Sequence, residues 1–137
     1  RGRITDRGMN KLKGLTNLRH LYLGDTKVGD LGAGWIEHFP KLEYLDLSKT
    51  AIDDSAMVYL GELCELKELD LADTKISDAG TGHLESLVKV ESLDLSRNRT
   101  TDESLFHLKP MKGLRILRIS NTDITGSGFR WLVPNVR

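Results

Sequence analysis

The fold is decided by residues 42–50, which read Leu-Glu-Tyr-Leu-Asp-Leu-Ser-Lys-Thr, and by the distance at which this stretch recurs. The pattern Leu-x-x-Leu-x-Leu-x-x-Thr/Asn, with conservative replacements, ends at five positions that are 24 residues apart: Thr26, Thr50, Thr74, Asn98 and Thr122. Self-similarity at a fixed period of this size is typical of repeat proteins, in which each copy packs on the next. We therefore expect a stack of similar short units.

A second short signature follows each copy. It reads Ala51-Ile52-Asp53-Asp54 in one copy and Lys75-Ile76-Ser77-Asp78 in the next, and the chain opens with a further example at Arg3-Ile4-Thr5-Asp6. In these two motifs the chain resembles the leucine-rich repeat family, and particularly a 24-residue Ile-Thr-Asp-x-Gly variety that looks like bacterial repeat proteins. The resemblance covers essentially the whole chain and implies a solenoid of about five and a half repeats.

The spacing of apolar residues within each repeat predicts one strand and one short helix. Leu45 and Leu47 alternate with polar residues, which is the period of a half-buried strand, whereas Leu60 and Leu63 are three apart, as on one helix face. We expect an α/β fold, with a curved parallel β-sheet on the concave face and short helices on the convex face. Residues 1–137 are predicted to form a single domain that is a segment of a longer protein, because the chain opens directly in the repeat.

Side-chain oxygens mark the expected helix starts, at Thr5, Asp53, Ser77, Thr101 and Thr125. We expect these side chains to cap free backbone N–H groups at the helix start. In the first four of these repeats an aspartate comes next, and we expect its negative charge to face the positive end of the helix. A column of small residues allows close packing of the helices: Gly8, Gly32, Ala56, Gly80, Ser104 and Gly128. The family resemblance implies that the Thr/Asn column bonds the backbone and forms a ladder along the stack. Burial in that ladder argues against glycosylation of Asn98, although Asn98-Arg99-Thr100 is formally an acceptor.

The composition gives the protein no net charge, and therefore no overall electrostatic field that would attract a nucleic acid or a membrane. Twenty Lys and Arg residues cancel twenty Asp and Glu residues, no apolar run is long enough to span a bilayer, and the helices carry no basic stripe. The one cysteine, Cys64, cannot form an intrachain disulfide, which favours a reducing compartment slightly. We therefore expect no nucleic acid or membrane partner.

The sequence also argues against a catalyst. Cys64 falls in a loop, away from His83 and His107 in later helices, and two histidines alone make a poor zinc site. The column of Trp35, Tyr59, His83, His107 and Trp131 is interpreted as packing between adjacent helices. We expect no enzyme activity, no cofactor and no metal.

Strand alternation predicts which side chains face out of the concave sheet. One inner column is His20, Tyr44, Glu68, Ser92 and Ile116, and the other is Tyr22, Asp46, Asp70, Asp94 and Arg118. Two outer columns alternate in charge, and we interpret them as internal ion-pair ladders: Arg19, Glu43, Lys67, Glu91 and Arg115 in one, and Asp25, Lys49, Asp73 and Arg97, ending at Asn121, in the other.

The three aligned aspartates allow two interpretations. Like charges about 5 Å apart destabilise the sheet unless a cation lies over them, which indicates an acidic strip for a partner with Lys or Arg side chains. Alternatively, Leu-Asp-Leu-Ser is simply a common sequence of this repeat, and the aspartate carboxylates are solvated and bind nothing. A calcium site is a weaker possibility, because the spaced carboxylates supply too few oxygens.

The favoured function is a protein-recognition scaffold that binds a protein or peptide with basic groups on the concave face. The residues expected to contact it are His20, Tyr22, Tyr44, Asp46, Glu68, Asp70, Asp94, Ile116 and Arg118. Two alternatives stay open: an architectural element of a larger assembly, and the substrate-recognition domain of a larger enzyme such as a ligase or kinase. Apolar residues at both ends, including Ile4 and Phe129, also predict end-to-end packing with flanking repeats or another chain.

Overall fold

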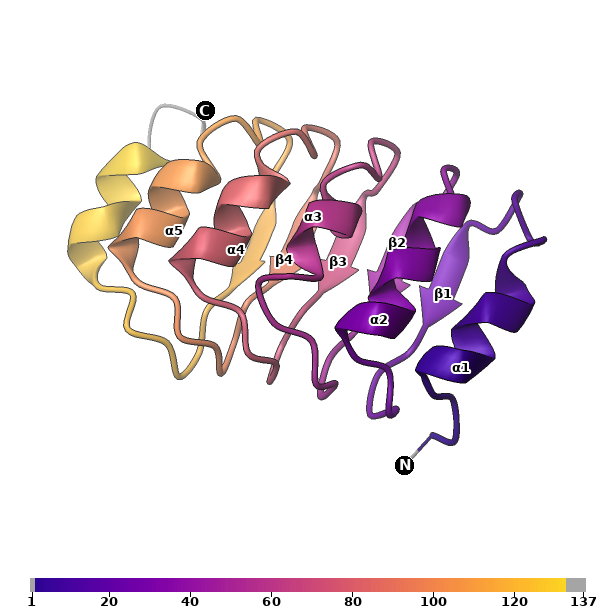
Figure 1. The fold of residues 1–137 in the computed structure, drawn as a ribbon. Coiled ribbons are helices and arrows are strands. Elements are labelled where there is room, and N and C mark those ends of the chain that lie inside the picture. The colour runs from indigo at the N-terminus through magenta and orange to yellow at the C-terminus, as the bar shows by residue number, and fades with distance from the viewer. Residues whose placement is uncertain (1, 133–137) are drawn as a thin grey trace.

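The protein forms a curved stack with a parallel sheet on one side and helices on the other (Figure 1). The structure, a computed structural model, describes residues 2–132. Within them, five three-residue strands pair in chain order: β1 (His20–Tyr22), β2 (Tyr44–Asp46), β3 (Glu68–Asp70), β4 (Ser92–Asp94) and β5 (Ile116–Arg118). Each residue pairs with the one 24 positions later, so Leu45 lies between Leu21 and Leu69. The predicted α/β solenoid is confirmed.

The helical segments of the described residues are short, and three of the six combine about one turn of α-helix with a stretch of 3₁₀ helix. They are α1 (Asp6–Met9) with η1 (Asn10–Leu12), α2 (Asp30–Ala33) with η2 (Gly34–His38), α3 (Met57–Leu60), α4 (Asp78–Thr81) with η3 (Gly82–Leu84), α5 (Asp102–His107), and η4 (Gly126–Trp131). Figure 1 shows them side by side along the convex face. None of the helices in residues 2–132 is long and apolar enough to cross a bilayer.

The core lies between these two layers. The inward leucines of the strands and the apolar residues of the helices are almost fully buried, among them Leu45, Leu69, Leu60 and Leu84. Burying each such side chain contributes about 1.5–3 kcal/mol, and no single repeat could bury its own. At the ends of the stack the burial is lost, as Leu15 and Phe129 show with exposed fractions of 52% and 42%.

The helix starts are built differently from the prediction. Thr101, Thr125 and Asp53 each accept a backbone N–H two residues later with their side chains, although α3 itself begins only at Met57. Thr5 and Ser77 make no such cap. The aspartates beside these positions instead accept backbone N–H groups of the next repeat. Asp6 accepts from Gly29, and the same bond joins Asp30 to Asp53, Asp54 to Ser77, Asp78 to Thr101 and Asp102 to Thr125. Neighbouring helices are therefore joined by a carboxylate ladder.

The column of small residues makes room for that ladder. A Cβ atom added to Gly32 would lie 2.5 Å from Oδ1 of Asp6, and one added to Gly128 would lie 2.6 Å from Oδ1 of Asp102. Ser104 occupies the same place in α5 and donates its hydroxyl to Asp78. The packing interpretation of this column was correct, and the group that needs the space is a carboxylate.

The turn that leaves each strand has two fixed features. The threonines of the Thr/Asn column donate their hydroxyls to the carbonyl three residues earlier, within their own repeat, as Thr50 does to Leu47. Within the described residues the column bonds across repeats at one step: the Asn98 Nδ2 donates to the carbonyl of Leu71, and its Oδ1 accepts from the Ile76 N–H and from the Thr74 hydroxyl. Asn98 is buried, as predicted.

The residue before each Thr or Asn has a positive φ of 54–58°: Asp25, Lys49, Asp73, Arg97 and Asn121. This left-handed conformation is uncommon for residues other than glycine. No ion pair joins Lys49, Asp73 and Arg97 in the described part of the chain, so the prediction of an ion-pair ladder is wrong for this outer column.

Candidate functional site

The candidate site is the sheet face that points away from the helices, which we call the concave face. In every strand the middle residue points into the core and its two neighbours point out. All nine residues predicted as partner contacts therefore lie on this face, and Tyr22 and Ile116 are among the most exposed, at 63% and 47%. Five of the nine are exposed and the other four, Tyr44, Asp46, Asp70 and Asp94, are half-buried.

Aromatic rings form one end of the concave face. The rings of Tyr22 and Tyr44 have centroids 4.6 Å apart with an angle of 34° between their planes, and His20 meets Tyr44 edge-on with a centroid distance of 6.2 Å. A hollow of about 330 Å³ lies among His20, Tyr22, Tyr44 and Glu68, with Glu43 and Lys67 on its rim. Packed tyrosines lose little side-chain entropy on binding, which makes them good anchors for a partner.

Carboxylates form the centre of the concave face. Asp46, Asp70 and Asp94 are directly paired by the sheet register, so their Cα atoms follow the strand spacing of about 4.8 Å. Each also accepts a backbone N–H two residues later, at distances of 2.9 Å, from Ser48, Ala72 and Ser96. This bond shapes the turn after the strand and gives the aspartates a structural role that the sequence analysis missed.

The charge at this centre is only partly compensated. Burial raises the pKa of Asp70, and the nearby carboxylates of Asp46 and Asp94 raise it further, whereas the Ala72 N–H and the Arg118 guanidinium act to lower it. The net shift is upward. The carboxylates of Asp46 and Asp94 therefore act on Asp70 as unfavourable neighbours.

At the other end of the face the character changes again. Arg118 occupies in β5 the place that Asp94 holds in β4. A hollow of about 260 Å³ lies between Glu68, Glu91, Arg115, Ile116 and Arg118, with Lys67 and Ser92 completing its lining. The face thus presents aromatic, acidic and then mixed groups in order along the stack.

The first outer column forms the expected ion-pair ladder over three repeats. Arg19 Nη1 lies 2.6 Å from Glu43 Oε1, and Lys67 Nζ lies 2.9 Å from Glu43 Oε2. The hydrogen bond from Lys67 is the main reason that the pKa of Glu43 is lowered. No ion pair links Glu91 to Lys67 or Arg115 among the described residues, so the ladder stops in the middle of the stack.

The remaining residues singled out in the sequence lie outside the concave face. Cys64 is exposed and free, and residues 2–132 hold no group of three or more side chains that could ligate a metal. Among the helix-face aromatics, Trp131 packs edge-on against Phe106 with a centroid distance of 5.2 Å, and the rings of Tyr59 and His107 lie against Gly34 and Gly82 of the preceding repeat. This agrees with their interpretation as packing residues.

Comparison with known proteins points to one family. Two family models described as leucine rich repeat match residues 1–52 and 63–81. An internalin from Listeria monocytogenes is 26% identical over 98% of this chain, with a TM-score of 0.84, and internalin C2 from the same species is 28% identical over 80%, with a TM-score of 0.69. A leucine-rich repeat protein from Leptospira interrogans, 19% identical over 92% of this chain, shares the fold with a TM-score of 0.69.

These structures are longer than the present chain. It spans 36% of the first internalin, 45% of internalin C2 and 37% of the Leptospira protein. No curated protein matches the chain.

Proposed function

The chain belongs to the leucine-rich repeat family, and we propose that it binds a protein partner on its concave face, with a basic side chain of the partner lying over Asp70. Proteins of this family are generally scaffolds for protein interaction and are typically not enzymes. The observation that carries the proposal is the open acidic row of Asp46, Asp70 and Asp94 beside the packed rings of Tyr22 and Tyr44.

Charge and shape together support a lysine or arginine of the partner at the centre of the face. A cation over Asp70 would interact with three carboxylates at once, and the raised pKa of Asp70 supports the need for one. The apolar part of the partner would then lie on Tyr22 and Tyr44, which have exposed ring surface next to the acidic row. Ile116 and Arg118 would contact the partner at the other end.

The test is capture of partners by the immobilised protein from the cells in which it occurs, with identification by mass spectrometry. Wild-type protein is compared with the double variant Asp70→Lys/Asp94→Lys and with the control Glu65→Lys/Glu103→Lys. The control makes the same change in net charge at exposed carboxylates that are not on the strands. Urea unfolding checks that all three proteins are folded.

We expect the specific partner to be captured by the wild type and the control and lost with the concave variant. Reversal should weaken binding at least tenfold, because each charge-assisted contact contributes about 1.5–3 kcal/mol. Equal capture by the folded concave variant would overturn the assignment.

A further inference from the structure

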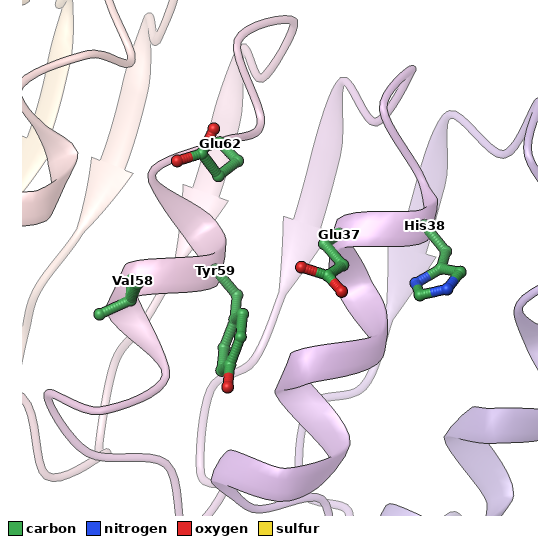
Figure 2. A pocket seen from close by; sticks show the side chains of 5 residues that line it. All are labelled: Glu37, His38, Val58, Tyr59 and Glu62. Carbon is green, nitrogen blue, oxygen red and sulfur yellow. The ribbon is translucent and has the colours of Figure 1, made fainter.

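A groove on the convex side separates the second and third repeats. Its volume is about 630 Å³, and Figure 2 shows its lining: Glu37 and His38 from η2, and Val58, Tyr59 and Glu62 from α3 and the residues just after it. Val58 is 51% exposed and Tyr59 is 36% exposed. The groove therefore combines accessible apolar and aromatic surface with two carboxylates.

The origin of the groove lies in one column of the repeat. Glu37, Gly61 and Glu85 are equivalent residues, of which Gly61 faces His83 and Glu85 faces His107, in each case 22 positions later. A Cβ atom on Gly61 would lie 2.5 Å from the carbonyl oxygen of His83, so this glycine allows repeats three and four to approach closely. Glu37 carries a full side chain at the equivalent place, and this side chain lines the groove.

The equivalent site in the fourth and fifth repeats already holds a basic ring. There His107 Nδ1 lies 2.7 Å from Glu85 Oε1, so the carboxylate is paired and the space is filled from within the chain. At the groove the same two columns hold Glu37 and Tyr59. Among the described residues neither Glu37 nor Glu62 has an ion pair.

Figure 2 shows the arrangement of Glu37, which has no ion pair among the described residues, and of the side chains around it. The carboxylate of Glu37 points toward α3, on the side where the ring of Tyr59 lies, and the ring of His38 is on the other side of Glu37. The Tyr59 ring also lies against Gly34, because a Cβ atom added to that glycine would be 3.5 Å from Cζ of the tyrosine. A planar cation can bond a carboxylate and stack on an aromatic ring at the same time, and among side chains arginine does this best.

We propose that this groove is a second binding site, which takes an arginine side chain that a partner protein presents next to an apolar residue. The guanidinium lies against Tyr59 and bonds Glu37, in the way that His107 bonds Glu85 within the chain. Glu62 adds negative charge at the rim, and the neighbouring apolar residue contacts Val58. This site is separate from the concave face and does not depend on the function proposed for that face.

Nuclear magnetic resonance titration of the ¹⁵N-labelled protein tests the proposal. The probes are acetyl-Leu-Arg-amide and acetyl-Leu-citrulline-amide, which have nearly the same shape but differ in charge. We expect saturable shifts of the amides around Val58–Glu62 with the arginine peptide, and affinity about tenfold lower with the citrulline peptide. Equal effects of both peptides, or shifts confined to the concave face, would overturn the proposal.

Three variants locate the contact. Glu37→Gln should weaken binding of the arginine peptide about tenfold, whereas Glu85→Gln, in the equivalent but already paired position, should leave it unchanged. Tyr59→His should also weaken binding. A histidine at position 59 can bond Glu37 as His107 bonds Glu85, so the Glu37 carboxylate would be paired within the chain. Urea unfolding of each variant confirms the fold, and unchanged binding by folded Glu37→Gln contradicts the assignment.

Discussion

At the scale of single residues, the most informative side chains are those that break the column to which they belong. Thr100 occupies an otherwise aliphatic column with Val28, Ile52, Ile76 and Ile124. Its Oγ1 is buried and has no hydrogen-bond partner within residues 2–132. A buried hydroxyl without a partner loses its hydration and gains nothing in return.

We expect Thr100→Val to stabilise the protein by about 1 kcal/mol, because valine has the same shape and leaves no unsatisfied group. The measurement is the free energy of unfolding in urea. Thr81→Val is the matched control, since the Thr81 hydroxyl donates to Asp78 and also bonds Ser104, and its loss should destabilise the fold. A lower stability for Thr100→Val would show that its hydroxyl has a partner after all.

At the scale of the elements, the sequence allowed the strands and the helical segments to be predicted from apolar spacing alone. The strand residues Leu45 and Leu69 alternate with polar neighbours because one face of the sheet is buried. This alternation of apolar and polar residues can be recognised within a single repeat. The hydrogen bonds between repeats could not be predicted in this way. Whether Asp78 faces its own helix or the next repeat depends on the stacking distance, which the spacing of apolar residues does not define.

The same limit applied to the candidate site. Strand alternation placed Tyr22, Asp70 and the other contacts on the concave face, but it could not show that Asp70 also accepts the N–H of Ala72. The convex groove was missed because Glu37 was not singled out in the sequence and Tyr59 was interpreted only as a packing residue. Comparing those two columns with Glu85 and His107 would have suggested that the residues meet.

The carboxylate ladder makes the stability of the helical layer depend on pH. Burial alone would raise the pKa of Asp78, but hydrogen bonds from Ser104 and Thr101 outweigh it and lower the pKa below its ordinary value. A depressed pKa means that the ionised form stabilises the fold above the ordinary aspartate pKa of about 3.9, and that this contribution is lost as the pH falls through the lower, folded-state value.

We therefore expect Asp78→Asn to lower the free energy of unfolding by about 1–2 kcal/mol at pH 7, with the difference from wild type shrinking below about pH 4. Urea unfolding at several pH values measures this. Asp123→Asn, at an exposed carboxylate, serves as the control and should change little at any pH. A pH-independent loss in Asp78→Asn would show that the ladder contributes by packing alone.

At the scale of the whole molecule, stability depends on contacts between neighbouring repeats, so position in the stack matters. Leu69 lies in the central strand and is 2% exposed, whereas Leu15 lies at the N-terminal end and is 52% exposed. Only neighbours contact each other, so a defect in the centre weakens two interfaces and one at the end weakens at most one.

Leu69→Ala should lower the free energy of unfolding by about 2–5 kcal/mol, and Leu15→Ala should lower it by well under half of that amount. Circular dichroism and the fluorescence of Trp35 and Trp131, which lie toward opposite ends, should report the same urea midpoint if the stack unfolds as one unit. Separate midpoints for the two signals in Leu69→Ala would show instead that the two halves unfold independently.

The alternating signs of Arg19, Glu43 and Lys67 have a consequence for how such a chain can change its length. The backbone repeats every 24 residues, but the charges of this column repeat every 48, so two successive copies form the electrostatic unit. Deleting one internal copy, for example residues 51–74, would place Glu43 beside Glu91, and duplicating one would likewise bring like charges together. Gain or loss of copies in pairs avoids this repulsion, so the concave face can grow or shrink by two strands at a time without altering the charge pattern along its edge.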